Sequence, residues 1–254
     1  MKTKNQIKLV SVNADAKTSK GSGKGWLTGI VYLAPAGEAG FGNMCPHASP
    51  GCLATCLFTA GRAGIFPAVN KARVARTHFL VHDRAGFRAQ LEDEIRALIR
   101  KAERENLQPA FRFNGTSDLD IIKLFPGLVE SFPQVAWYDY TKSYQRAMEW
   151  SKGALPSNYQ LTFSLSETNA DKALELIRKG VNVSAVVDDI SVPMAHGFAI
   201  NGEVFKAING DESDLRFLDP QANYLAGFVV LLKAKGKAKK DTTGFVRRYK
   251  AVTA

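Results

Sequence analysis

Three cysteines are the residues of this chain with the clearest capacity for chemistry, because all of them lie within residues 45–56. Cys45, Cys52 and Cys56 follow the pattern Cys-x6-Cys-x3-Cys in a loop that also holds two prolines and a glycine. An odd number of closely spaced cysteines does not build a disulfide framework. Cys52 and Cys56 can share one face of a helical turn, with Cys45 reaching back from the loop. The pattern therefore predicts three thiolates that converge on one metal centre.

Two kinds of metal centre fit these donors. Three thiolates suit a [4Fe-4S] cluster, in which the missing fourth ligand leaves one iron open to a small molecule. Zinc is the alternative, because His47 would complete a Cys₃His tetrahedral set and make the site structural. A third interpretation treats the cysteines as small apolar side chains that bind no metal. We favour the cluster, and His47 is the residue that discriminates it from zinc.

The composition is that of a globular protein. The chain has 254 residues, of which 45% are hydrophobic, so it can bury a sizeable core. No apolar run approaches the ~20 residues that a membrane span requires, and the N-terminal stretch lacks the apolar centre of a signal peptide. We therefore expect a cytoplasmic protein with no membrane partner.

Short apolar runs alternate with amphipathic stretches along the chain. Strands are expected at residues 29–34, 110–114, 135–140, 160–165, 182–187, 203–208 and 227–232. Helices are expected at residues 68–81, 86–105, 119–131, 144–152 and 170–179. This alternation predicts an α/β fold with parallel strands, either a partial or full (β/α) TIM-like barrel or an open doubly wound sheet. We favour the barrel, as one domain over residues 27–254 that follows an extended N-terminal arm of residues 1–26.

Ligands of parallel α/β folds bind beyond the carboxyl ends of the strands, and short polar residues follow the second expected strand. These are Asn114, Gly115, Thr116, Ser117 and Asp118, which we call the strand-end turn. Their side chains are suited to hold the amine and hydroxyl groups of a ligand. Ser117 or Asp118 could equally cap the helix expected to follow. Both interpretations stay open.

The net charge of +10 is unevenly distributed. Five lysines lie within residues 233–240, and Arg247, Arg248 and Lys250 follow them. Such a segment can grip phosphate groups by electrostatics, so a nucleic acid is a candidate partner. Aromatic residues are sparse there, so base recognition is not indicated. The alternative is a segment that only increases solubility.

Four stretches together resemble a family of phage-encoded proteins known as gene product eighty-eight. They are the cysteine loop at residues 45–56 and the stretches 59–62, 73–77 and 114–118. The resemblance covers most of the chain. It implies a viral origin, so the expected cytoplasm is that of an infected host cell, and it implies no particular activity.

The strand order, the loop position and the cysteine count are also similar to those of the radical S-adenosylmethionine enzymes. That resemblance implies a partial (β/α) barrel and an open iron that binds the amino and carboxylate groups of S-adenosylmethionine. It assigns cofactor contacts to the strand-end turn, and to Ser164 and Glu167 after the fourth strand. The spacing differs, because those enzymes usually have Cys-x3-Cys-x2-Cys, with an aromatic residue where this chain has Thr55.

The sequence therefore supports three hypotheses. The first is a radical S-adenosylmethionine-like enzyme that carries an iron–sulfur cluster and acts on a substrate that the sequence does not indicate. The second is a non-enzymatic iron–sulfur or structural zinc protein. The third is a nucleic-acid-associated protein in which the metal is only structural.

Overall fold

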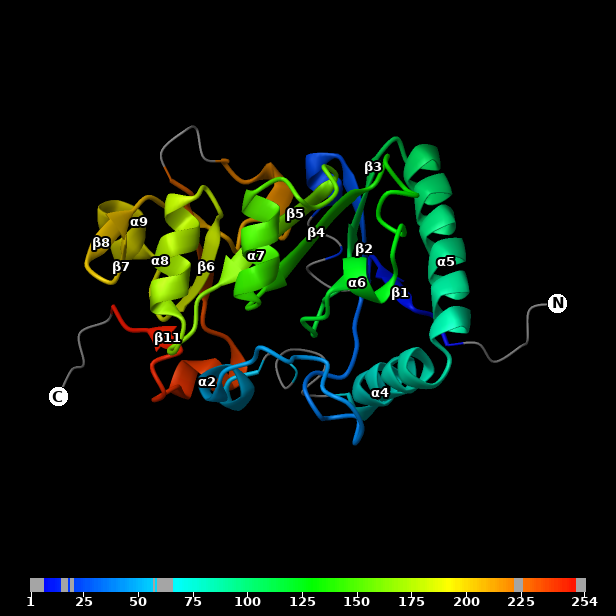
Figure 1. Cartoon of the computed structure of the whole chain (residues 1–254), viewed down its shortest axis with the longest axis horizontal. Coiled ribbons are helices and arrows are strands. Elements are labelled where there is room, and N and C mark those ends of the chain that lie inside the picture. The colour runs from blue at the N-terminus through cyan, green and yellow to red at the C-terminus, as the bar shows by residue number, and fades with distance from the viewer. Residues whose placement is uncertain are drawn as a thin grey trace. The chain divides into compact units, whose positions relative to one another are not determined.

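A computed structural model describes residues 7–14, 18, 21–56, 58, 66–221 and 226–249 of the chain. The chain separates into two compact units, whose elements are labelled in Figure 1. Unit 1 comprises Met1–Pro46 and Arg62–Asp139, and unit 2 comprises His47–Gly61 and Tyr140–Ala254. Residues 45–56, the cysteine loop, are therefore divided between the two units.

Unit 1 combines mostly parallel strands with two long helices. Its elements are β1 (Val10–Val12), η1 (Ser22–Lys24), β2 (Trp26–Val31), α4 (Pro67–His82), α5 (Arg84–Arg104), β3 (Gln108–Arg112), α6 (Ile121–Leu124) and the first four residues of β4 (Ala136–Thr141). The strand order is β1-β2-β3-β4. Strand β1 is antiparallel to β2, whereas β2, β3 and β4 are parallel.

Helix α5 covers the strands of unit 1 with one apolar face. Phe87, Leu91, Ile95 and Leu98 recur at helical spacing and are buried. A Cβ atom at Gly29 of β2 would lie 2.7 Å from the Val10 side chain and 2.8 Å from the Leu98 side chain, so these side chains would have to shift to admit a larger residue. This packing gives unit 1 its core.

Unit 2 holds the second set of parallel strands. Its elements are α2 (Pro50–Ala54), α7 (Tyr144–Ser151), β5 (Tyr159–Ser164), α8 (Ala170–Arg178), β6 (Val183–Val187), α9 (Ser191–His196), β7 (Phe198–Ile200), β8 (Glu203–Phe205), β9 (Ala207–Asn209), η3 (Arg216–Leu218), β10 (Val229–Lys233), η4 (Gly236–Lys240) and β11 (Val246–Arg247). The strand order is β5-β6-β10-β9, all parallel. Strands β7 and β8 form a separate antiparallel pair.

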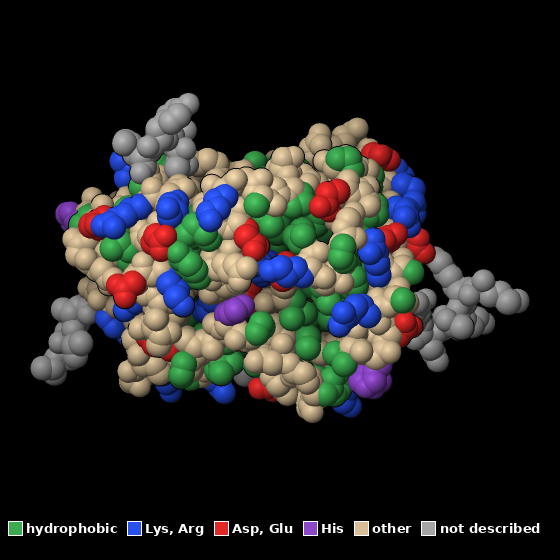
Figure 2. Space-filling view, in the orientation of Figure 1, with side chains coloured by type: hydrophobic (Ala, Val, Ile, Leu, Met, Phe, Trp, Pro, Cys, Tyr) green, Lys and Arg blue, Asp and Glu red, His purple; other side chains and the backbone are tan. Residues whose placement is uncertain are grey.

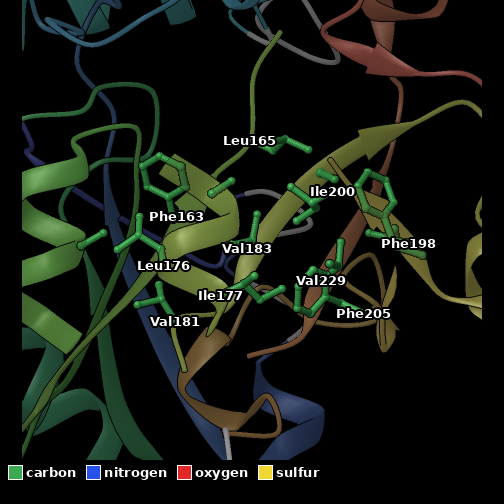
Figure 3. Close-up of a cluster of buried hydrophobic side chains, with 14 of the residues drawn as sticks. Phe163, Leu165, Leu176, Ile177, Val181, Val183, Phe198, Ile200, Phe205 and Val229 are labelled. Carbon is green, nitrogen blue, oxygen red and sulfur yellow. The ribbon is translucent and has the colours of Figure 1, made fainter. Parts of the chain in front are cut away.

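A large cluster of buried apolar side chains lies in the core of unit 2 (Figure 3). Phe163 and Val183 come from adjacent parallel strands, and Leu176 and Ile177 come from α8. The pair Phe198 and Phe205 and several further members of the cluster are also fully or almost fully buried. Removing this apolar area from water is the main force that stabilises the unit.

The expected alternation of strands and helices is confirmed, because both units combine helices with mostly parallel strands. The closed barrel that we favoured is not found among the described strands. The strand order of unit 1 ends at β1, which is antiparallel and at the edge, and that of unit 2 ends at β9. A closed barrel has no edge strands, so the strand orders are those of open sheets.

Three local expectations differ from the structure. The helix expected at 119–131 is limited to α6, because Pro126 lacks an amide donor and Gly127 takes a positive φ of 78°. The strand expected at 203–208 divides into β8 and β9, which pair with different partners. Within the expected N-terminal arm, β1 pairs with β2. Among the described residues, no helix combines the length and apolar character needed to cross a membrane.

Candidate metal centre

The loop that carries Cys45 lies on the strand-end turn of unit 1. The Cys45 thiol is 3.7 Å from the carbonyl oxygen of Thr116. The Asp118 amide donates a hydrogen bond of 2.8 Å to the carbonyl of Met44, next to the cysteine. The Thr116 hydroxyl donates to the carbonyl of Leu33, which follows β2. The structure thus brings the first predicted metal ligand to the turn predicted to bind a cofactor.

Asn114 stabilises this turn from inside. Its side-chain amide nitrogen donates to the Leu119 carbonyl at 2.9 Å and to the Asp139 carboxylate at 3.0 Å. Its side-chain oxygen accepts from the Ser117 hydroxyl and the Leu119 amide, both at 2.8 Å. Asn114 and Asp139 are each 1% exposed. Asn114 therefore shapes the turn with all its side-chain polar atoms, whereas the sequence predicted that it contacts a ligand.

Gly115 is required by close packing. A Cβ atom at this position would lie 2.5 Å from the Tyr32 ring and 2.7 Å from Ile30, both of the neighbouring chain segment at β2. The Gly115 amide also donates to the Val31 carbonyl at 3.0 Å. A larger residue would move the turn away from β2 and would therefore also displace Cys45, which lies on this turn.

Two arginines of α4 reach the same end of β2. The Arg73 guanidinium lies 5.7 Å from the centroid of the Tyr32 ring, and Arg76 donates to the carbonyl groups of Lys8 and Tyr32. Burial lowers the pKa of Arg76 from its ordinary value; the charge of Glu94 opposes this shift, and the charge of Arg73 adds to it. Positive charge therefore lies close to the segment that leads to Cys45.

Cys52 lies in the short helix α2 of unit 2, which we call the cysteine helix. Ser49 caps this helix, since its hydroxyl oxygen accepts a hydrogen bond of 3.2 Å from the Cys52 amide. Pro50 occupies the first helical position, where a missing amide donor costs nothing. Cys56 lies two residues past the last residue of the helix, Ala54, and its amide donates to the Leu53 carbonyl. The helix therefore ends before Cys56, so the expected helical turn from Cys52 to Cys56 is formed only in part.

Glu167 holds the cysteine helix at the carboxyl end of β5. Its carboxylate accepts a hydrogen bond of 2.7 Å from the Gly51 amide and one of 2.8 Å from the Ser49 hydroxyl. Bonds of this kind to an ionised group are stronger than neutral ones. The resemblance assigned a cofactor contact to Glu167, whereas the structure shows both of its carboxylate oxygens bound to the segment that carries Cys52.

The other polar residues at this strand end make contacts within unit 2. Ser164 is half-buried in β5, and its hydroxyl lies 3.3 Å from that of Ser184 in the adjacent strand. The Ser166 carbonyl accepts from the Arg247 guanidinium at 3.2 Å. Arg247 belongs to β11, which pairs with the carboxyl end of β6. The C-terminal segment therefore shares this strand end with Glu167.

The C-terminal segment also contacts the cysteine helix. A Cβ atom at Gly51 would overlap the Thr243 hydroxyl and lie 2.8 Å from the Glu167 carboxylate. Both partners are more than a hundred residues away in the chain. The sequence offered no local signal for these contacts, although a glycine between Pro50 and Cys52 is consistent with a need for space.

The thiols themselves are partly accessible. None of Cys45, Cys52 and Cys56 is in a disulfide, and each is intermediate in exposure. His47, the potential fourth zinc ligand, is exposed. Across the described residues, no group of three or more His, Cys, Asp or Glu side chains is arranged to hold a metal ion. Thiol groups are nevertheless the ligands that thiophilic metals prefer. Residues 59–62, which include Arg62, lie outside the described residues.

Comparison with known proteins identifies the family. The family model described as Gene product 88 matches residues 5–249. The chain belongs to the Gene product 88 family. No curated protein and no solved structure matches the chain. The resemblance to gene product eighty-eight proteins is thus confirmed over almost the whole length of this Gene product 88 protein.

Proposed function

We propose that this Gene product 88 protein binds a [4Fe-4S] cluster through Cys45, Cys52 and Cys56. One observation carries the proposal: all the cysteines of the chain lie in one loop, and none is in a disulfide. In unit 1 the loop is seated on the turn after β3, and in unit 2 it is held by Glu167 after β5. Carboxyl ends of parallel strands are where α/β proteins place their ligands.

The chemistry of the donors favours this metal centre over others. Thiolates select iron–sulfur clusters and zinc, whereas magnesium and calcium prefer oxygen ligands. Three thiolates complete three of the four ligand positions of a cubane cluster. The hydrogen bonds from Ser49 and Gly51 to Glu167 order the helix around Cys52, which lowers the entropic cost of gathering ligands.

The finer part of the proposal is an enzyme that resembles the radical S-adenosylmethionine enzymes, including their partial (β/α) barrel. A cluster held by three thiolates has one iron without a protein ligand, and when bound it supplies an electron to a coordinated small molecule. Asp118 is the acidic side chain of the strand-end turn, and its amide binds the Met44 carbonyl next to Cys45. It is our candidate for the contact to the amino group of the cofactor.

The cluster is tested by anaerobic purification of the full chain. We expect a brown protein with iron and acid-labile sulfide, and we expect each of Cys45→Ser, Cys52→Ser and Cys56→Ser to lose both. His47→Ala is the matched control and should keep the cluster. One tightly bound zinc that is lost in His47→Ala would overturn the proposal in favour of a structural zinc protein.

The enzyme is tested separately, by electron paramagnetic resonance of the reduced cluster. S-adenosylmethionine should change the spectrum, and Asp118→Ala should weaken its binding by about 1.5 to 3 kcal/mol without loss of iron. A spectrum that stays the same at saturating cofactor would remove the radical enzyme and leave a non-enzymatic cluster protein.

A further inference from the structure

Residues 233–248, which we call the basic segment, hold most of the excess positive charge of the chain. They include Lys233, Lys235, Lys237, Lys239, Lys240, Arg247 and Arg248, against one acidic residue, Asp241. Seven positive charges less one negative charge give +6, out of +10 for the whole chain. On the face shown in Figure 2, by contrast, basic and acidic side chains are interspersed.

The basic segment is an ordered part of unit 2. Ala234, Ala238 and Val246 form a small buried cluster beneath it. The Asp241 carboxylate accepts hydrogen bonds from the hydroxyl and amide of Thr243 and from the Val246 amide, at 2.7, 3.1 and 2.9 Å. Strand β11 then joins β6. The lysines are therefore presented from a fixed backbone, which reduces the entropy lost when a partner binds.

Three lysines of η4 are available to a partner. Lys237, Lys239 and Lys240 are exposed, and their ammonium groups form no ion pair among the described residues. The flanking Lys235 differs, since it pairs with Asp211 at 2.6 Å. Unneutralised charges gathered on a short ordered segment create a local positive potential that attracts polyanions.

The basic segment lies beside the cysteine helix. Thr243 is in contact with Gly51, and Arg247 donates to the Ser166 carbonyl next to Glu167. Figure 1 shows α2 next to the chain segment that leads into β11. A polyanion bound to the basic segment would therefore pass close to Cys52.

We propose that the basic segment binds the phosphate backbone of a nucleic acid and holds it beside the cysteine helix. Lysines act as point charges for phosphates, and such binding needs no contact with the bases. A membrane surface fits less well, because the segment has no large exposed hydrophobic side chain to insert. The proposal goes beyond the metal centre, and binding by the lysines does not require a cluster.

The test is fluorescence anisotropy of the full chain with a short labelled DNA duplex and a short single strand, over a range of salt concentrations. Lys237→Ala/Lys239→Ala/Lys240→Ala is the test variant. Lys152→Ala/Lys179→Ala/Lys206→Ala is the matched control, since it removes the same charge from exposed positions elsewhere in unit 2. The test variant should bind roughly tenfold more weakly or worse at low salt, and its slope of log Kd against log salt should fall by about 2 to 3. The control variant should keep the affinity and the salt slope of the unchanged chain.

Two further arms make the result decisive. The metal-free chain, prepared with an iron chelator, should bind as the untreated chain does, so a failure of the metal proposal cannot imitate a failure of this one. Equal losses in both triple variants would mean that only net charge matters, and would overturn the proposal. So would absence of binding at low salt, or binding through the same lysines to anionic lipid vesicles but not to nucleic acid.

Discussion

The Glu167 carboxylate accepts a hydrogen bond from the Gly51 amide at 2.7 Å, although the two residues are 116 positions apart in the chain. Glu167 follows β5, and Gly51 is the second residue of the cysteine helix. The same carboxylate accepts from the Ser49 hydroxyl at the helix cap. One acidic side chain therefore fixes both the start of the helix and its place at the strand end.

Glu167→Gln should weaken this attachment without changing the size of the side chain. The new amide oxygen can still accept from Gly51, but its NH₂ group cannot accept from the Ser49 hydroxyl. We expect the free energy of unfolding to fall by about 1 to 2 kcal/mol in urea denaturation. Glu130→Gln, at an exposed position, is the control and should change it by less than about 0.5 kcal/mol. Equal stability of the two variants would contradict the role of Glu167.

Gly51→Ala should be destabilising because the added methyl group has no space. It would overlap the Thr243 hydroxyl and press on the Glu167 carboxylate. Overpacking of this kind costs about 1 to 3 kcal/mol. In a double-mutant cycle with Thr243→Ala, the double variant should be more stable than the sum of the single effects predicts. Strict additivity would show that the two residues are not in contact.

Asp139→Asn should disturb the turn that seats Cys45. The Asp139 carboxylate accepts from the amide and from the side chain of Asn114, and both residues are almost fully buried. The oxygen of the new asparagine can still accept from one of these donors, but its NH₂ group would face the other, which should cost about 1 to 3 kcal/mol of stability. Asp93→Asn, whose side chain is 80% exposed, should cost less than about 0.5 kcal/mol. Thermal unfolding of both variants, compared at one pH, checks the difference.

Asp241 should give the protein a stability that depends on pH. Burial would raise the pKa of Asp241, but the hydrogen bonds from Val246 and Thr243 and the charge of Arg248 outweigh it, so the pKa lies below 3.8. A carboxylate with a lowered pKa stabilises the fold above the pKa of the unfolded chain and loses that effect as pH falls through the folded value. Asp241→Asn should therefore be less stable than the unchanged chain near pH 7.

The difference in free energy of unfolding between the unchanged chain and Asp241→Asn, which we call the gap, should narrow below about pH 4. There the Asp241 carboxylate of the unfolded chain begins to bind a proton. Chemical denaturation at a series of pH values measures this gap. A gap that stays constant down to the lowest pH at which both proteins fold would contradict the lowered pKa.

Local sequence patterns predicted most of the strands and helices, because each has the apolar spacing that its burial demands. The long helix α5 is an example, with its buried face readable from residues 87 to 98. The predicted strand ends were less accurate where a buried segment continues beyond the residues that pair with a neighbouring strand. The strand expected at 29–34 ends its pairing earlier, and Ala34 instead donates its amide to the Thr77 hydroxyl. Apolar character in a sequence indicates that a residue is buried, but it does not indicate which group its main-chain amide binds.

The candidate site was predictable only in part. The clustering of the cysteines and the turn after β3 are visible in the sequence, since each is a local pattern. The hydrogen bonds from Gly51 to Glu167 and the pairing of β11 with β6 join segments far apart in the chain. Such contacts depend on how the whole unit folds, and no local pattern encodes them.

The position of Cys45 depends partly on the hydrogen bond from the Asp118 amide to the carbonyl of the preceding residue, Met44. Both atoms belong to the main chain, so a substitution at these positions leaves the bond in place unless it puts proline at residue 118. An alanine scan of the turn would therefore not detect the contribution of this hydrogen bond. Replacing the amide at residue 118 by an ester would remove the donor and leave every side chain in place. As far as this one bond is concerned, every residue type except proline at position 118 supplies the same donor to the Met44 carbonyl.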